Sequence, residues 1–87
     1  MNREEIKERL IELCGEIFRD EGIDFGLIKY VDFYNDLGMD SISFISMIVE
    51  IEACFDITIP DDMLLMENFR NVTDVVHIVF DLLAKKH

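Results

Sequence analysis

The sequence predicts an all-α fold: a small four-helix bundle with three longer helices, one short third helix and a long loop between the first two. Three observations support this prediction. Apolar residues recur at spacings of three and four along separate segments. No two segments alternate in the manner of paired strands. The chain has 87 residues, 51% of them apolar, which suits one small core, so we expect a single domain over residues 1–87.

The first helix is predicted over residues 2–20. Its apolar positions lie on one helical face, at Ile6, Leu10, Leu13 and Ile17. Asn2, with Glu5 three residues later, is typical of a helix N-cap. The sequence DEG at Asp20–Gly22 predicts the end of this helix. Residues 21–39 then hold glycines and no clean period, and we expect them to form a long ordered loop.

The second helix is predicted over residues 41–55, with Asp40 as an N-cap whose carboxylate can accept from first-turn amides. A helical wheel divides its apolar residues into two stripes. The core stripe comprises Phe44, Met47, Ile48, Ile51 and Phe55. The outer stripe, beside Ser41, comprises Ile42, Ile45 and Val49. A contiguous exposed apolar strip is typical of a binding surface, unless the long loop covers it.

Three further segments complete the predicted bundle. Residues 56–60 have the alternation of an extended piece that ends at a proline. Residues 61–67, which open with two aspartates, predict the short helix. Residues 72–85 predict the last helix, with Asn71 as its cap.

Net charge indicates the class of partner, and cysteine content indicates the cellular location. The formal charge is −11, which argues against nucleic acid and anionic membranes and favours basic protein partners, although acidity also serves solubility. No apolar run is long enough to span a bilayer, so we expect no membrane insertion. Cys14 and Cys54 lie far apart and indicate reduced thiols. With no visible leader, these features predict a cytoplasmic protein.

No catalytic or metal-binding template fits the chain, so we do not expect an enzyme. Neither His77 nor His87 has a set of neighbouring ligands that would complete a zinc site. Ser41 does not lie in a G-x-S-x-G motif, and no histidine is placed by sequence to activate it. Asp40 and Ser41 could simply begin a helix, as these residue types often do.

From Asp36 to Pro60 the chain reads DLGMDSISFISMIVEIEACFDITIP, and this stretch resembles the acyl carrier protein family. The similarity lies in Asp-Leu-Gly, a spacer, Asp40 with Ser41, the apolar Ile42, and a helix that ends at Phe55 before an Ile-x-Ile-Pro exit. The Asp-Ser pair alone is common, whereas the full motif with its helix is specific.

The resemblance implies a role for Ser41 that needs no catalytic base. In the family, the serine at this position is esterified with 4′-phosphopantetheine, which a phosphopantetheinyl transferase donates from coenzyme A. The thiol of the arm carries acyl chains as thioesters between acyl-loading, acyl-transferring or condensing enzymes. Asp40 would hold the turn beside this site. The second helix is the family's main recognition surface, which implies partner contacts at Ile42, Ile45, Val49, Glu50 and Glu52.

The chain departs from the family along this helix. Carriers of primary fatty acid synthesis have several acidic residues there, whereas this chain has Ser43, Ser46 and Ala53, and keeps only Glu50 and Glu52. We therefore expect a carrier of a specialised pathway, such as polyketide, nonribosomal peptide or modified lipid synthesis. Because the chain opens with Met and has no Pro- or Gly-rich linker, we expect a discrete protein. We also expect it to be a monomer.

Two alternatives stay open at this point. An aminoacyl or peptidyl carrier of a nonribosomal peptide pathway shares the fold and the modified serine and differs in cargo. An acidic helical adaptor that binds a basic partner would carry no modification. The chemistry of Ser41 distinguishes this adaptor from both kinds of carrier.

Overall fold

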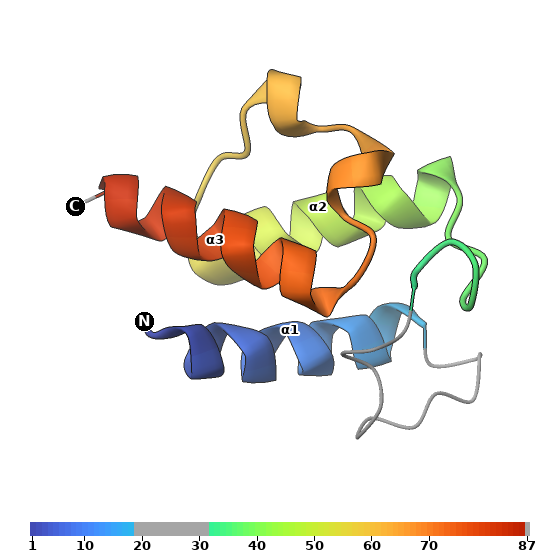
Figure 1. Ribbon diagram of the computed structural model, residues 1–87, viewed down its shortest axis with the longest axis horizontal. Helices are drawn as coiled ribbons and strands as arrows, with labels where there is room; N and C mark the ends of the chain where they lie inside the picture. Colours follow the sequence, from blue (N-terminus) through green and yellow to red (C-terminus); the bar gives the residue numbers. More distant parts are fainter. Residues whose placement is uncertain (19–31, 87) are drawn as a thin grey trace.

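A computed structural model describes residues 1–18 and 32–86 of the chain (Figure 1). These residues form α-helices and short 3-10 helices and no strands, which confirms the all-α prediction. Helix α1 packs against both α2 and α3, and Figure 1 shows α1 and α3 running side by side. The elements are α1 (Arg3–Ile17), α2 (Ser41–Phe55), η3 (Asp61–Met63), η4 (Met66–Asn68) and α3 (Val72–Lys86).

The start of α1 matches the predicted capping arrangement. The side chain of Asn2 accepts a hydrogen bond from the amide of Glu5 at 2.9 Å, and the Glu5 carboxylate accepts from the Asn2 amide at 3.2 Å. The two residues therefore satisfy donors that the first helical turn leaves without partners. The helix ends at Ile17. The stop predicted at Asp20–Gly22 lies outside the described residues, as does the loop up to residue 31.

Helices α2 and α3 agree closely with their predicted bounds. Helix α2 begins at Ser41 and ends at Phe55 as expected. Helix α3 continues one residue past the predicted end. Asn71 caps α3 as predicted, because its side-chain oxygen accepts from the amide of Asp74 at 2.9 Å.

The segment over residues 61–67 differs from its prediction. Instead of one short helix it contains two 3-10 turns, η3 and η4. Leu64 and Leu65 separate the two turns, and the ψ angle of Leu64 is 54°, which is incompatible with a continuing helix. The predicted count of four helices is therefore not confirmed for the described residues.

The core stripe of α2 is buried as the helical wheel predicted. Met47 and Ile51 have no exposed surface, and Phe55 is 5% exposed. These side chains share one cluster with apolar residues of the other two helices, among them Ile6, Leu10, Val75 and Val79. Phe44 meets Phe69 edge to face, with ring centroids 5.5 Å apart, in a geometry that aromatic pairs favour.

Phe33 anchors the turn that leads into α2. Its ring is fully buried and stacks on Phe18, with centroids 5.8 Å apart. Its amide donates to the carbonyl of Arg70 at 2.7 Å, and its carbonyl accepts from the amide of Met39 at 2.8 Å. Phe33 thus ties the approach to α2 to the corner that precedes α3.

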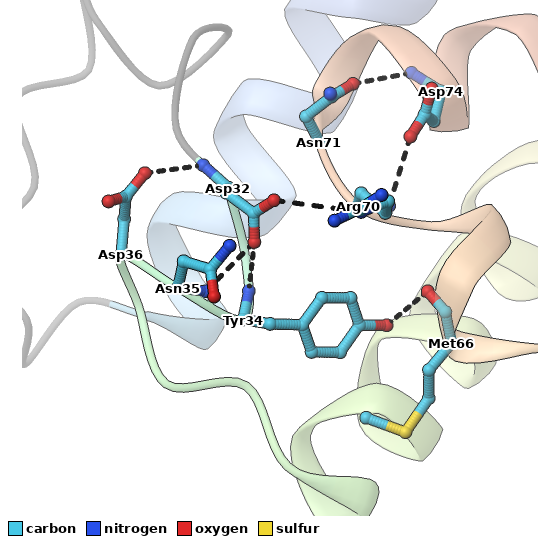
Figure 2. A network of polar contacts seen from close by, with 8 residues as sticks. All are labelled: Asp32, Tyr34, Asn35, Asp36, Met66, Arg70, Asn71 and Asp74. Carbon is cyan, nitrogen blue, oxygen red and sulfur yellow. Dashed lines mark hydrogen bonds and ion pairs between the residues drawn. The ribbon is translucent and has the colours of Figure 1, made fainter.

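Polar contacts hold the same turn in shape (Figure 2). The Asp32 carboxylate accepts from the amides of Tyr34 and Asn35, each at 2.9 Å. Its second oxygen lies 3.9 Å from the guanidinium of Arg70. The Asp36 carboxylate accepts from the Asp32 amide at 2.8 Å. The turn over residues 33–37 is therefore closed by its own side chains and joined to the α3 corner by an ion pair.

Tyr34 connects this turn to η4. Its hydroxyl donates to the carbonyl of Met66, as Figure 2 shows. Burial of the phenol, with a further contribution from the Asp32 carboxylate, raises the pKa of Tyr34 to about 12. The hydroxyl therefore keeps its proton, and can donate this hydrogen bond, throughout the physiological pH range.

Gly38 has a backbone conformation that explains its presence in the Asp-Leu-Gly sequence. Its φ angle is +63°, in the left-handed region that side chains with a Cβ disfavour. A Cβ placed there would meet no atom within 4 Å. The requirement for glycine is therefore conformational and not one of space.

We predict that Phe55→Ala lowers the free energy of unfolding by about 3–5 kcal/mol, because truncating a buried aromatic leaves a cavity in the core. Urea titration followed by circular dichroism measures the change. Ile42→Ala is the exposed control on the same helix, and we expect it to change stability by less than about 0.5 kcal/mol. An unchanged midpoint for Phe55→Ala would contradict the core assignment.

At Gly38 we predict that alanine destabilises the fold by about 1 kcal/mol, since a left-handed backbone is strained for most L residues. Asparagine tolerates this region better and serves as the matched control. Urea midpoints for Gly38→Ala and Gly38→Asn test the prediction. Equal stability of Gly38→Ala and the native chain would show that the left-handed conformation is not required.

Candidate functional site

Ser41 is the first residue of α2 and is exposed. The preceding residue, Asp40, has an extended backbone, and its carboxylate accepts from the amide of Ser43 at 2.9 Å. The Asp40 carbonyl in turn accepts from the amide of Phe44 at 2.9 Å. The predicted cap is confirmed, and it sets the direction in which the chain enters the helix beside the Ser41 hydroxyl.

The capping contact also affects the ionisation of the Asp40 carboxyl. The hydrogen bond from the Ser43 backbone, followed by one from the Ser43 side chain, lowers the pKa of Asp40 below its ordinary value. A carboxyl whose pKa is lower in the folded state contributes stability above its unfolded pKa and loses it as pH falls through the lowered value. The cap therefore stays charged at neutral pH and is lost only in acid.

The outer stripe is exposed in the structure. Ile42 is 76% exposed, Ile45 is 61% exposed and Val49 is 56% exposed. Exposed apolar side chains are ordinary one by one, but three along one helical strip form a contiguous apolar surface. The described part of the predicted loop, residues 32–39, leaves these side chains exposed, and the rest of that loop lies outside the described residues.

The two acidic residues of α2 have different surroundings. Glu50 is exposed and lies on the surface. Glu52 is partly buried, and its carboxylate accepts from the amide of Ile59 at 2.9 Å. That hydrogen bond holds the segment after α2 against the helix end, so Glu52 has a structural contact that the sequence did not indicate.

The two histidines are the remaining candidate groups. His77 is exposed on α3, and its ring lies 3.9 Å from the Asp81 carboxylate. The spacing of four residues could have indicated this pair, which our sequence analysis missed. His87 lies outside the described residues. Within residues 1–18 and 32–86, no group of three or more His, Cys, Asp or Glu residues could hold a metal ion.

The two cysteines differ in exposure. Cys14 is buried, and burial raises the pKa of its thiol to about 12, so it stays a thiol. Cys54 is exposed on α2, and neither cysteine is in a disulfide.

A helix able to cross a membrane would need a longer apolar run than any in the described part of the chain provides.

One exposed apolar side chain was missed by sequence reasoning. Leu65, between η3 and η4, is 50% exposed. It lies in an apolar run from Met63 to Met66 with no helical period, so the pattern does not indicate which of these side chains faces solvent.

The amino-acid sequence around Ser41 is similar to that of known proteins. A family model described as "Phosphopantetheine attachment site" matches residues 8–79, which include Ser41 and all of α2. An acyl carrier protein of Guillardia theta is 33% identical over 97% of this chain and 99% of its own length. One of Tropheryma whipplei (strain Twist) is 36% identical over 84% of this chain and 89% of its length.

A third relative, an acyl carrier protein of Prochlorococcus marinus (strain MIT 9515), is 31% identical over 91% of this chain and 94% of its length. These relatives extend along nearly the whole chain, not only the motif around Ser41. The sequence resemblance is thereby confirmed, and phosphopantetheine attachment is the property that the matched family model describes. The chain belongs to the acyl carrier protein family.

Proposed function

We propose that Ser41 is the residue through which this acyl carrier holds 4′-phosphopantetheine. The observation that carries the proposal is an exposed hydroxyl on the first residue of α2, beside a side-chain cap at Asp40. The start of a helix bears a partial positive charge and favours a phosphodiester at that position. The exposed hydroxyl also leaves a separate transferase free to approach.

The reaction at Ser41 transfers the phosphopantetheine group from coenzyme A to the serine hydroxyl. The hydroxyl oxygen forms a bond to the phosphorus that carries pantetheine, and the pyrophosphate bond of coenzyme A breaks to release adenosine 3′,5′-bisphosphate. The hydroxyl proton passes to a base of the transferase, so the carrier needs no base of its own and we propose that it is not an enzyme. The pantetheine thiol then supplies the thioester that carries an acyl group.

The outer stripe is the proposed contact surface for partner enzymes. It begins at Ile42, next to Ser41, and is exposed along two turns of α2. Acyl-loading, acyl-transferring and condensing enzymes are the partners that this function requires. Glu50 could contribute at its edge, whereas Glu52 already accepts a backbone hydrogen bond.

The relatives favour acyl cargo over aminoacyl or peptidyl cargo, because each relative described above is named as an acyl carrier protein. The few acidic residues of α2 support a specialised pathway. The match of one family model to residues 8–79 supports a single carrier domain, which we propose acts as a monomer. Two free thiols are compatible with a cytoplasmic location.

We predict that incubation with coenzyme A and a phosphopantetheinyl transferase adds one phosphopantetheine to the chain, and that Ser41→Ala abolishes the gain. Intact-mass spectrometry measures both. Ser46→Ala, on an exposed position of the same helix, is the control that should still be modified. A gain that survives Ser41→Ala would contradict the assignment of the site, and no gain with several transferases would favour the unmodified adaptor.

For the outer stripe we predict that Ile45→Glu leaves the circular dichroism spectrum and melting temperature nearly unchanged, because the side chain is 61% exposed. The same change should reduce kcat/KM for the transferase by about tenfold or more, since apolar anchors carry much of the energy of an interface. A large fall in melting temperature would assign Ile45 to the core instead. Unchanged kinetics would remove it from the contact surface.

A further inference from the structure

A hollow of about 390 Å³ lies between the turn over residues 33–37 and η4. The residues that line it are Tyr34, Asn35, Met66, Glu67 and Arg70. Clefts of this size commonly bind small molecules. We propose that this hollow receives the pantetheine arm carried by Ser41, and that Asn35 and Arg70 form hydrogen bonds to the amides of the arm. The inference rests on the proposed function of Ser41.

The phenol ring of Tyr34 forms an apolar wall of the hollow. Its hydroxyl donates to the carbonyl of Met66, and Figure 2 shows the ring reaching from the turn to η4. Tyr34 and Met66 are both half-buried, so each keeps part of its surface open. The pantetheine arm has a pair of methyl groups near its phosphate end. Packing these methyl groups on the open surface would remove apolar area from water, which is favourable.

The polar groups of the hollow match the amides of the arm. Asn35 is exposed, and its side-chain amide offers both donors and an acceptor. The Arg70 side chain is 58% exposed, and its Nε lies 3.9 Å from the Asp32 carboxylate. Because this ion pair involves one guanidinium nitrogen, the others can donate to a carbonyl oxygen of the arm. Glu67 is exposed and can accept from an amide N–H.

The arm is long enough to reach the hollow from Ser41. The amide of Gly38 donates to the Tyr34 carbonyl at 3.1 Å. Ser41 lies three residues after Gly38, and such a stretch of chain spans about 10–11 Å at most. From phosphorus to sulfur the arm has about as many bonds as four residues of peptide, which gives about 13–14 Å when extended. The serine side chain and the phosphate add to this reach.

Attachment to Ser41 makes weak contacts sufficient. A group held by a short flexible linker has an effective concentration in the millimolar range near its site. A few hydrogen bonds and a small apolar contact can therefore keep the arm in the hollow for much of the time. They would still release it to a partner enzyme that binds it more tightly.

A second hollow, of about 490 Å³, lies between η4 and α3 and fits the arm less well. Its ionisable groups are Glu67, Asp74 and His77. The two carboxylates accept hydrogen bonds and cannot donate them, so they offer nothing to the carbonyl groups of the arm. Among the described residues that line this hollow, the one amide side chain, Asn68, already donates to a backbone carbonyl at 3.2 Å.

Isotope-filtered NMR of the modified chain tests the proposal. The chain is labelled with heavy carbon and nitrogen isotopes and then modified with unlabelled coenzyme A, so that contacts between the arm and the protein are observed selectively. We expect nuclear Overhauser effects (NOEs) from the methyl groups of the arm to the Tyr34 ring and to the Met66 methyl group. NOEs confined to the first turn of α2 would overturn the proposal. NOEs to Ile78, in the second hollow, would overturn it as well.

Two substitutions test the polar contacts. Asn35→Ala and Arg70→Gln should each lower the NOE intensities at least about twofold, because one hydrogen bond changes an equilibrium by a factor of a few. Thr73→Ala, at an exposed residue of the second hollow, is the control and should leave them unchanged. Melting temperatures establish that each variant is folded. Since Arg70 also pairs with Asp32, Asn35→Ala decides the outcome if Arg70→Gln unfolds the chain, and unchanged NOEs in Asn35→Ala would overturn the assigned contact.

Intact-mass spectrometry separates this proposal from the proposed function. If no transferase adds mass to the native chain, the proposed function fails and this inference fails with it. A modified chain that lacks the NOEs to Tyr34 and Met66 would overturn the inference alone and leave the attachment at Ser41 in place.

Discussion

The pair of backbone hydrogen bonds made by Phe33 is the constraint on which the site depends. One joins the turn before α2 to Arg70 at the start of α3, and the other returns the chain at Met39, just before the cap. With its ring buried against Phe18, Phe33 cannot shift without opening the core. The cap at Asp40 and the exposed Ser41 are therefore held by contacts that lie outside α2 itself.

Helix α2 has apolar side chains on two sides, one buried and one exposed. One side supplies the core stripe, and the other carries Ser41 and the outer stripe toward solvent. Most surface helices of small bundles have one apolar face, and a second exposed one weakens solubility unless a partner covers it. The strong negative charge of the rest of the chain offsets that tendency. The same helix can thus stabilise the fold and remain available for binding.

The parts predictable from sequence are those set by local rules. The bounds of α2, its cap and its two stripes follow from helical period and from Asp40, and the structure agrees. The 3-10 turns and the role of Glu52 were not predictable, because they depend on distant contacts. Tyr34 bonds to Met66 across the fold, and Glu52 reaches Ile59 only because the chain reverses at Asp56, whose φ angle is +53°.

We propose that Ser41, and no other serine, carries the phosphopantetheine arm. Three serines, Ser41, Ser43 and Ser46, lie on the first two turns of α2, so a mass gain of the intact protein alone does not separate them. Tandem mass spectrometry of the peptide that contains α2, after modification by the transferase, places the group on a single residue. We expect fragment ions that carry the added mass from Ser41 onward. Fragments that place the added mass on Ser43 or Ser46 would contradict the assignment to Ser41.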